Sequence, residues 1–158
     1  MGFQAEPSGS AGLLAEVFAA KTNTQNTWTT DVAQTIDGWT DSIDTSSAFA
    51  SNTFTSPTDG ILDIDMNIHA GTPGDSNNVS LWLWACIGGV KVAGSVKRFA
   101  CLNGYPDTKS YSYTLPVSAG NAVTFQAVWG AASNRLLGLY DPDTLTPQST
   151  LSLKLRSI

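Results

Sequence analysis

The chain has 158 residues, of which 42% are hydrophobic and only 13% are charged, whereas an average soluble domain is about 25% charged. A chain of this length folds as one domain with a sizeable core and needs no metal ion or disulfide to stabilise it. Eight Lys and Arg against thirteen Asp and Glu give a net charge of -5, which argues against a nucleic-acid partner. Ser and Thr supply much of the polarity, a composition that favours strands and turns and hence an all-β fold.

The N-terminal segment differs from the rest in composition. Residues 1–12 are rich in Gly, Ser, Pro and Ala, which predicts a flexible leader. Residues 13–21 predict a short helix, and its apolar side would carry Leu13, Leu14, Val17 and Phe18. We therefore expect residues 1–27 to form a leader or connector and residues 28–158 to form the folded domain.

Targeting signals are not visible in the sequence. No Lys or Arg precedes the apolar residues near the N-terminus, and Glu16 interrupts them, which is unlike a secretory signal peptide. No segment approaches the roughly 20 apolar residues of a membrane span. We expect a protein that is made and folded in a cytosol and does not insert into a membrane.

Candidate strands begin near residue 28. Residues 28–36 and 39–43 flank Asp37-Gly38, a dipeptide typical of tight hairpins, and residues 49–55 precede a turn at 57–60. Residues 60–70 alternate most regularly, which indicates a strand with one buried and one solvated face. The apolar set is Leu62, Ile64, Met66 and Ile68, and the polar set is Asp63, Asp65, Asn67 and His69.

Residues 79–87 carry large side chains on both faces of a predicted strand, so we expect both faces to be covered. One face has Val79, Leu81, Leu83, Ala85 and Ile87, and the other has Ser80, Trp82, Trp84 and Cys86. Gly88-Gly89 then supplies the positive φ angles of a tight hairpin, which leads into a strand at residues 90–99.

The C-terminal part continues the pattern of short strands. Residues 111–117 form one strand, a turn follows at 118–121, and residues 123–129 form the next strand with Val123, Phe125, Ala127 and Trp129 on one face. A shorter candidate at 135–140 ends at Asp141-Pro142, and residues 150–158 close the chain with Leu151, Leu153 and Leu155 on one face. Eight to ten strands predict two antiparallel sheets packed face to face, most simply a jelly roll.

Three stretches resemble the C1q and tumour-necrosis-factor-like jelly roll. They are AFASNTFTSPTDGILDIDMNIHA at residues 48–70, YTLPVSAGNAVTFQAVW at 113–129, and STLSLKLRSI at 149–158, and they follow the order of the family. The last stretch is especially similar to the closing strand of viral fibre and tail proteins. The resemblance covers roughly residues 28–158.

The resemblance implies a homotrimer in which the sheet that contains the last strand faces the threefold axis. We expect the contact between copies to involve Trp82, Trp84, Trp129, Leu153 and Leu155, because the chain has more aromatic and apolar area than one small sandwich needs. The alternative is a monomer whose tryptophans pack in its own core.

Catalytic chemistry has little support in the sequence. Asp63 and Asp65 lie two residues apart on one strand face, about 7 Å from each other, so a glycosidase-like pair is geometrically possible. Such carboxylates are far more often simply solvated, and His69, the only histidine, is expected to be an exposed strand residue. No Ser-His-Asp order, G-x-S-x-G or H-E-x-x-H motif is present. We expect no enzymatic activity and no cofactor.

Metal and thiol chemistry are also weakly indicated. Asp141 and Asp143, with Asp107 or Asn103, could offer oxygen ligands to Ca²⁺, but loop carboxylates are also ordinary turn formers, which is the interpretation we favour. Cys86 and Cys101 have no CxxC or histidine spacing that indicates zinc. We expect two buried free thiols, with a disulfide as the alternative. The basic residues Lys91, Lys97 and Arg98 are too few for a nucleic-acid surface and are expected to flank a solvated hairpin.

Binding is better supported than catalysis. We expect the loops at residues 86–91, 117–121 and 141–149 to be neighbours at the end of the sandwich opposite the chain ends, since loops on a rigid scaffold commonly carry recognition. The candidate ligand-binding residues for glycan hydroxyls are Asn121, Asp141, Asp143 and Thr144.

The functional hypothesis is therefore a trimeric, non-enzymatic virion protein, made in the host cytoplasm. It would be a phage tail-fibre, tail-spike or head-fibre knob that binds a host surface receptor or glycan and joins other virion proteins through its N-terminal segment. The alternative is a purely structural capsid or tail module, such as a decoration or assembly joint, without receptor binding.

Overall fold

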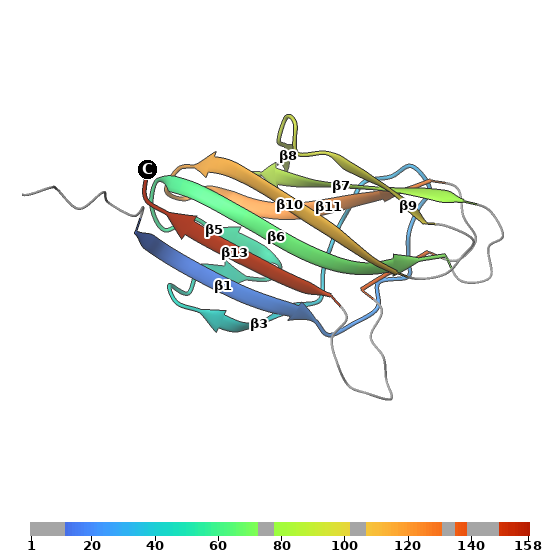
Figure 1. The fold of residues 1–158 in the computed structure, drawn as a ribbon, viewed down its shortest axis with the longest axis horizontal. Helices are drawn as coiled ribbons and strands as arrows, with labels where there is room; N and C mark the ends of the chain where they lie inside the picture. The colour runs from blue at the N-terminus through green and yellow to red at the C-terminus, as the bar shows by residue number, and fades with distance from the viewer. Residues whose placement is uncertain (1–11, 73–77, 102–106, 131–134, 139–148) are drawn as a thin grey trace, which may run out of the picture.

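The computed structural model describes residues 12–72, 78–101, 107–130, 135–138 and 149–158. This part of the chain consists of strands and turns, and it includes no helix that is long and apolar enough to span a membrane. The strands form two antiparallel sheets, which lie one over the other as a sandwich (Figure 1).

The first sheet, sheet A, has the strand order β10-β6-β13-β1-β3, with β12 beside β6. Its strands are β1 (Leu13–Lys21), β3 (Trp39–Asp44), β6 (Gly60–Gly71), β10 (Asp107–Val117), β12 (Leu136–Leu137) and β13 (Thr150–Arg156). The closing strand β13 lies in the middle of this sheet, between β6 and β1, so the two ends of the chain meet in one sheet.

The second sheet, sheet B, has the strand order β4-β5-β11-β7-β8, with β2 beside β11 and β9 beside β7. Its strands are β2 (Gln34–Thr35), β4 (Phe49–Ala50), β5 (Thr53–Thr55), β7 (Val79–Ile87), β8 (Val90–Lys91), β9 (Lys97–Cys101) and β11 (Ala122–Trp129). These two sheets confirm the predicted jelly-roll sandwich.

Every second residue of a strand points between the two sheets, and these residues form the core. The apolar sets predicted for β6, β7, β11 and β13 are nearly all buried there, and Trp129 is fully buried in edge-to-face contact with Trp28, with 6.5 Å between ring centroids. Side chains of β10 close one open side of the sandwich, where Lys109 Nζ donates to the carbonyl of Ala100 at 2.7 Å and Tyr111 Oη donates to the carbonyl of Ser95 at 2.9 Å. These hydrogen bonds link β10 of sheet A to the part of the chain that forms β8 and β9 of sheet B.

The helix predicted at residues 13–21 is wrong, because these residues form β1 in sheet A. Ala15, Val17, Ala19 and Lys21 are buried in alternation, which is the period of a strand. The outward positions of β1 include Leu14 and Phe18, and these apolar residues concealed the alternation. The sandwich therefore begins at residue 13, and not at the expected boundary of residue 28.

The hairpin predicted at Asp37-Gly38 is also wrong. The segment before this dipeptide contributes only the short β2, which pairs with β11 in sheet B, and the segment after it forms β3, which pairs with β1 in sheet A. Gly38 has a φ of 73°, so the chain turns sharply there but passes from one sheet to the other.

The hairpin at Gly88-Gly89 is confirmed, with φ angles of 56° and 79°. The strand expected at residues 90–99 is interrupted: β8 ends at Lys91, a turn at Ala93-Gly94 follows, and β9 begins at Lys97. Short strands of this kind raise the number of strands to thirteen in the described residues, against the eight to ten expected.

The two ends of the sandwich carry different loops from those expected. Val117 pairs with Gly60 and Arg156 with Ile61, so the turn at 118–121 lies at the same end as the chain termini. The Gly88 amide donates to the carbonyl of Ala122 at 2.8 Å, which places the 88–89 turn there as well. The prediction that these loops lie opposite the chain ends is therefore wrong.

Candidate functional site

The structure divides the predicted interface residues between two locations. Trp129, Leu153 and Leu155 are 0% exposed within one chain, so the core accounts for their burial and no part of them is left for a second copy. Trp82 and Trp84 lie on the outward face of β7 in sheet B. Sheet B does not contain the closing strand, so the two tryptophans are not on the sheet expected to face the threefold axis.

Of the predicted ligand-binding loop residues, only Asn121 lies within the described residues. Its side-chain Oδ1 accepts the Ser118 amide at 2.9 Å and its own amide donates to the Ser118 carbonyl at 3.0 Å. The side chain therefore stabilises the turn between β10 and β11. Asp141, Asp143 and Thr144 lie outside the described residues.

The outward face of sheet A is covered by polar pairs that cross the strands. In one row, Glu16, Lys154, Asp63 and Thr114 are neighbours on four adjacent strands. Lys154 Nζ lies 3.4 Å from Glu16 Oε1, Arg156 Nε donates to Asp63 Oδ2 at 2.6 Å, and Thr114 Oγ1 donates to Asp63 Oδ1 at 2.8 Å. The ionised groups of this row are thus paired within the chain.

The neighbouring rows of the same face continue the pattern with hydroxyl and amide groups. Asp65 lies between Ser112 and Ser152, and Ser110 Oγ donates to Asn67 Oδ1 at 2.7 Å. His69 Nδ1 lies 3.4 Å from Thr108 Oγ1. Burial lowers the pKa of His69, opposed by the charge of Asp107. His69 is therefore a half-buried strand residue rather than the exposed one expected.

The carboxylates Asp63 and Asp65 share this outward face, as the alternation predicted. The hydrogen bond from Arg156 is the main cause that holds the pKa of Asp63 below its usual value, despite partial burial. A carboxyl of this kind stays ionised near neutral pH and does not supply a proton to a leaving group. Asp63 therefore has a structural role in the contacts between neighbouring strands.

One edge of sheet A exposes apolar side chains instead. Among the described residues, four of the eight large apolar side chains that are exposed lie on β1 and β3: Leu13, Leu14, Phe18 and Ile43. Phe18 and Ile43 are direct cross-strand neighbours and are 38% and 47% exposed. Exposed neighbours of this size mark a surface suited to contact with another protein.

The outward face of sheet B has a different chemistry, because it combines aromatic rings with cations. The Arg98 guanidinium lies over the Trp82 ring at 5.6 Å from its centroid, and the Lys91 ammonium lies over the Trp84 ring at 5.4 Å. Gln126 on β11 accepts the Trp84 indole N–H at 3.2 Å. We call Trp82, Trp84, Lys91, Arg98 and Gln126 the aromatic-cationic patch.

The two sheets differ in their charged residues. The strands of sheet B contain three cations, Lys91, Lys97 and Arg98, and no Asp or Glu. Within the described part of the chain, no carboxylate lies within ion-pair distance of these three, whereas all four cations of the sheet A strands have such a partner. Lys97 Nζ donates to the Ser110 carbonyl of sheet A at 2.8 Å, so the charges of sheet B that are available to an external ligand are those of Lys91 and Arg98.

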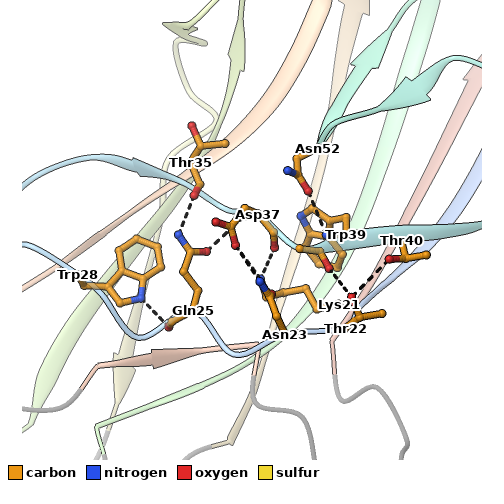
Figure 2. A network of polar contacts seen from close by, with 11 residues as sticks. Lys21, Thr22, Asn23, Gln25, Trp28, Thr35, Asp37, Trp39, Thr40 and Asn52 are labelled. Carbon is orange, nitrogen blue, oxygen red and sulfur yellow. Dashed lines mark hydrogen bonds and ion pairs between the residues drawn. The ribbon is translucent and has the colours of Figure 1, made fainter.

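A buried lysine anchors the crossing between the sheets. Lys21 is 1% exposed, and Figure 2 shows its ammonium between Asn23 and Asp37 and beside the Trp39 ring. It donates to Asn23 Oδ1 at 3.1 Å and to the Asp37 carbonyl, and lies 3.7 Å from Asp37 Oδ1. Burial lowers the pKa of Lys21 to about 8, although Asp37 opposes the shift. These contacts hold the 37–38 crossing in place.

The two cysteines are free and buried, as favoured from the sequence. Burial raises the pKa of Cys101 to about 11 and also raises the pKa of Cys86. Thiols of this kind are inert packing groups. The described residues include no cluster of His, Cys, Asp and Glu that could hold a metal ion, and the loop proposed for Ca²⁺ lies outside them.

Solved structures of very different sequence share this fold. The globular domain of zebrafish complement 1qA aligns with a TM-score of 0.54 at 13% identity and covers 89% of this chain and 96% of that chain. Murine APRIL at pH 5.0 aligns with a TM-score of 0.58 at 8% identity, over 89% and 98% of the two chains. Eiger TNF from S. frugiperda aligns with a TM-score of 0.56 at 11% identity, over 90% and 91%. No protein-family model and no curated protein matches the sequence. The chain has the C1q/TNF-like jelly-roll fold that its sequence motifs predicted.

Proposed function

We propose that this chain is the head domain of a homotrimeric, non-enzymatic virion protein, a phage fibre or knob that attaches to the host cell surface. The main support for the trimer is the composition of the outward face of sheet A. This face contains the closing strand, exposes Phe18 and Ile43 side by side, and pairs Glu16 with Lys154 and Asp63 with Arg156 within the chain.

These properties suit an interface between copies. Contacts between subunits combine a central apolar region with few unpaired charges, because an unpaired charge loses its hydration on association. The apolar edge of Leu14, Phe18 and Ile43 provides the first property, and the paired row around Asp63 provides the second. The C1q/TNF resemblance independently implies that this sheet faces the threefold axis.

The outward face of sheet B is the surface that we assign to attachment. If sheet A is covered by copies, sheet B faces outward in each subunit, and three equal surfaces bind a repetitive cell surface with avidity. The virion assignment rests on the likeness of residues 149–158 to the closing strand of viral fibre and tail proteins.

Light scattering of the purified chain at micromolar concentration tests the trimer. A single chain has a mass of 16.6 kDa, so a trimer of the whole chain is expected at about 50 kDa. A mass of one chain at this concentration contradicts the proposal.

Binding of labelled protein to susceptible bacteria tests the attachment role. We expect binding to susceptible cells and none to resistant derivatives of the same strain. A trimer that binds no cell of the host range supports the structural capsid or tail module instead.

A further inference from the structure

The aromatic-cationic patch on sheet B is the most distinctive group of side chains that the proposed trimer leaves uncovered in the part of the chain that the structure describes. Trp82 and Trp84 lie two residues apart on the outward face of β7, so their Cα atoms are about 7 Å apart along the strand. Arg98 on β9 is the cross-strand partner of Trp82, and Lys91 on β8 is the partner of Cys86, two residues after Trp84 on the same face of β7. Two rings thus form a row along one strand, with a cation beside each ring.

Hydrogen bonds hold Arg98 in place and leave some of its donors free. Arg98 donates through Nε and Nη2 to Ser80 Oγ at 2.9 and 2.7 Å, which orients the guanidinium over Trp82. A guanidinium has five N–H donors, so donors remain for a ligand. Arg98 and Lys91 are both exposed, and no carboxylate of the described residues pairs with them.

We propose that this patch binds an acidic polysaccharide, a chain of sugar rings that carry carboxylates. The apolar C–H face of a sugar ring packs against the partly exposed indole ring of Trp82. Trp84 is only 9% exposed, and its ring supports Lys91 from below rather than contacting the sugar. A carboxylate on the same or the next ring accepts charge-assisted hydrogen bonds from Arg98 and an ionic contact from Lys91. The inference rests on the proposed attachment role and names the ligand class for it.

An acidic glycan fits better than a nucleic acid. A nucleic acid carries a phosphate at every nucleotide, and its affinity depends on many cations that together neutralise a run of phosphates. This patch offers only two cations in a chain of net charge -5. A polysaccharide with widely spaced carboxylates needs no more, and three patches on a trimer add avidity.

Titration calorimetry of the full chain with alginate oligosaccharides, which are polymers of carboxylated sugars, tests the proposal. We expect binding that weakens as NaCl rises from about 50 to about 200 mM, and no binding of dextran oligosaccharides of equal length, which carry no charge. We expect Arg98→Gln and Trp82→Ala each to weaken alginate binding at least about tenfold, since a charge-assisted contact or a stacked ring is lost. Trp82→Phe retains most of the affinity, because it keeps an aromatic ring.

Lys97→Gln is the matched control. Lys97 precedes Arg98 on β9, but its ammonium reaches to the other sheet, where it donates to the Ser110 carbonyl at 2.8 Å. The substitution removes the same charge from the opposite side of the strand, so we expect a less than twofold change in affinity. Circular dichroism and light scattering establish that each variant is folded and has the wild-type mass.

Several results would overturn the proposal. One is wild-type affinity for alginate in the Arg98→Gln and Trp82→Ala variants, and another is equal weakening by Lys97→Gln. A third is binding of single-stranded DNA of equal charge with the same affinity as alginate. Cell binding distinguishes the proposed binding patch from the proposed attachment role. If the variants bind susceptible cells as the wild type does, the patch is not the binding site, but the attachment role is retained. A wild type that binds neither cells nor alginate contradicts both proposals.

Discussion

The two outward faces of this sandwich are both formed by antiparallel strands, but they differ in chemistry. On sheet A every cation of the described strands has a carboxylate partner, as in Arg156 with Asp63 and Lys154 with Glu16, and the exposed apolar residues include the neighbours Phe18 and Ile43. On sheet B the cations Lys91 and Arg98 lie over tryptophan rings and have no carboxylate partner in the described residues. A face with paired charges is suited to burial against a copy, and a face with unpaired cations is suited to an external anion.

The largest effect is expected from a charge in the apolar edge of sheet A. Phe18→Asp places three carboxylates in the proposed contacts, at a cost of about 2 kcal/mol at each of the three. We expect the trimer to dissociate to the mass of a single chain at micromolar concentration, as measured by light scattering. Val90→Asp is the control, because Val90 is 73% exposed on the hairpin of sheet B. If both variants keep the mass of the wild type, sheet A is not the interface.

The next prediction separates the core from the interface. Leu153→Ala removes a side chain that is 0% exposed within one chain, so we expect the free energy of unfolding to fall by about 3 kcal/mol. Thr124→Ala, on the outward face of sheet B, is expected to change it by less than about 1 kcal/mol. Urea unfolding at one fixed protein concentration measures both. If Leu153→Ala dissociates the trimer but leaves the free energy of unfolding unchanged, Leu153 contributes to the contact between copies and not to the core.

Lys21 gives a pH-dependent prediction. Because burial lowers its pKa to about 8 from 10.5, the folded chain binds fewer protons than the unfolded chain between these values, so stability rises with pH in this window. Relative to Lys21→Met, we expect the wild type to gain about 2 kcal/mol between about pH 7.5 and pH 9.5. Urea midpoints at the two pH values measure the difference.

The charge of Asp37 affects the pH range in which Lys21 changes the free energy of unfolding. Asp37 opposes the shift of the Lys21 pKa, so Asp37→Asn is expected to lower this pKa further and to let the gain in stability begin at a lower pH. An Asp37→Asn protein with an unchanged pH profile contradicts the assignment of the ion pair.

The smallest effect is expected from the exposed pair of Asp63 and Arg156. A double-mutant cycle of Asp63→Asn and Arg156→Gln in the monomeric Phe18→Asp background should give a small stabilising coupling at neutral pH, because solvent screens an exposed ion pair. Since the pKa of Asp63 is lowered from 3.8, this coupling is present above that value and is lost as the pH falls through the lower folded value. A coupling that persists in strong acid would show that the ion pair is not its source.

Alternation predicted the central strands well, because their two faces meet different environments. In β6 the apolar set from Leu62 to Ile68 faces the core and the polar set faces outward, as expected. The strand β1 was missed because its outward residues Leu14 and Phe18 are also apolar, so the period of two is hidden. The dipeptide at Asp37-Gly38 predicted a sharp turn, but a local turn signal does not specify whether the flanking segments pair or join different sheets.

The candidate surfaces were predicted only in part. The sequence placed Trp82 and Trp84 on one strand face, but alternation does not show that the leucines of β13 and Trp129 would be fully covered within one chain. Recognition of the cations beside the tryptophans requires the register between strands. The Gly88-Gly89 hairpin fixes Lys91 opposite Cys86, and the turn after β8 sets Arg98 opposite Trp82, which local patterns do not reveal.

The most direct test of the contrast between the faces is acetylation of lysines in the assembled protein, followed by peptide mass spectrometry. The side chain of Lys154 on sheet A is 54% exposed in a single chain, and Lys91 on sheet B is also exposed. At micromolar concentration we expect Lys91 to react and Lys154 to be protected, and we expect Lys154 to react in the Phe18→Asp variant. Equal reaction of both lysines in the wild type would contradict the burial of sheet A against its copies.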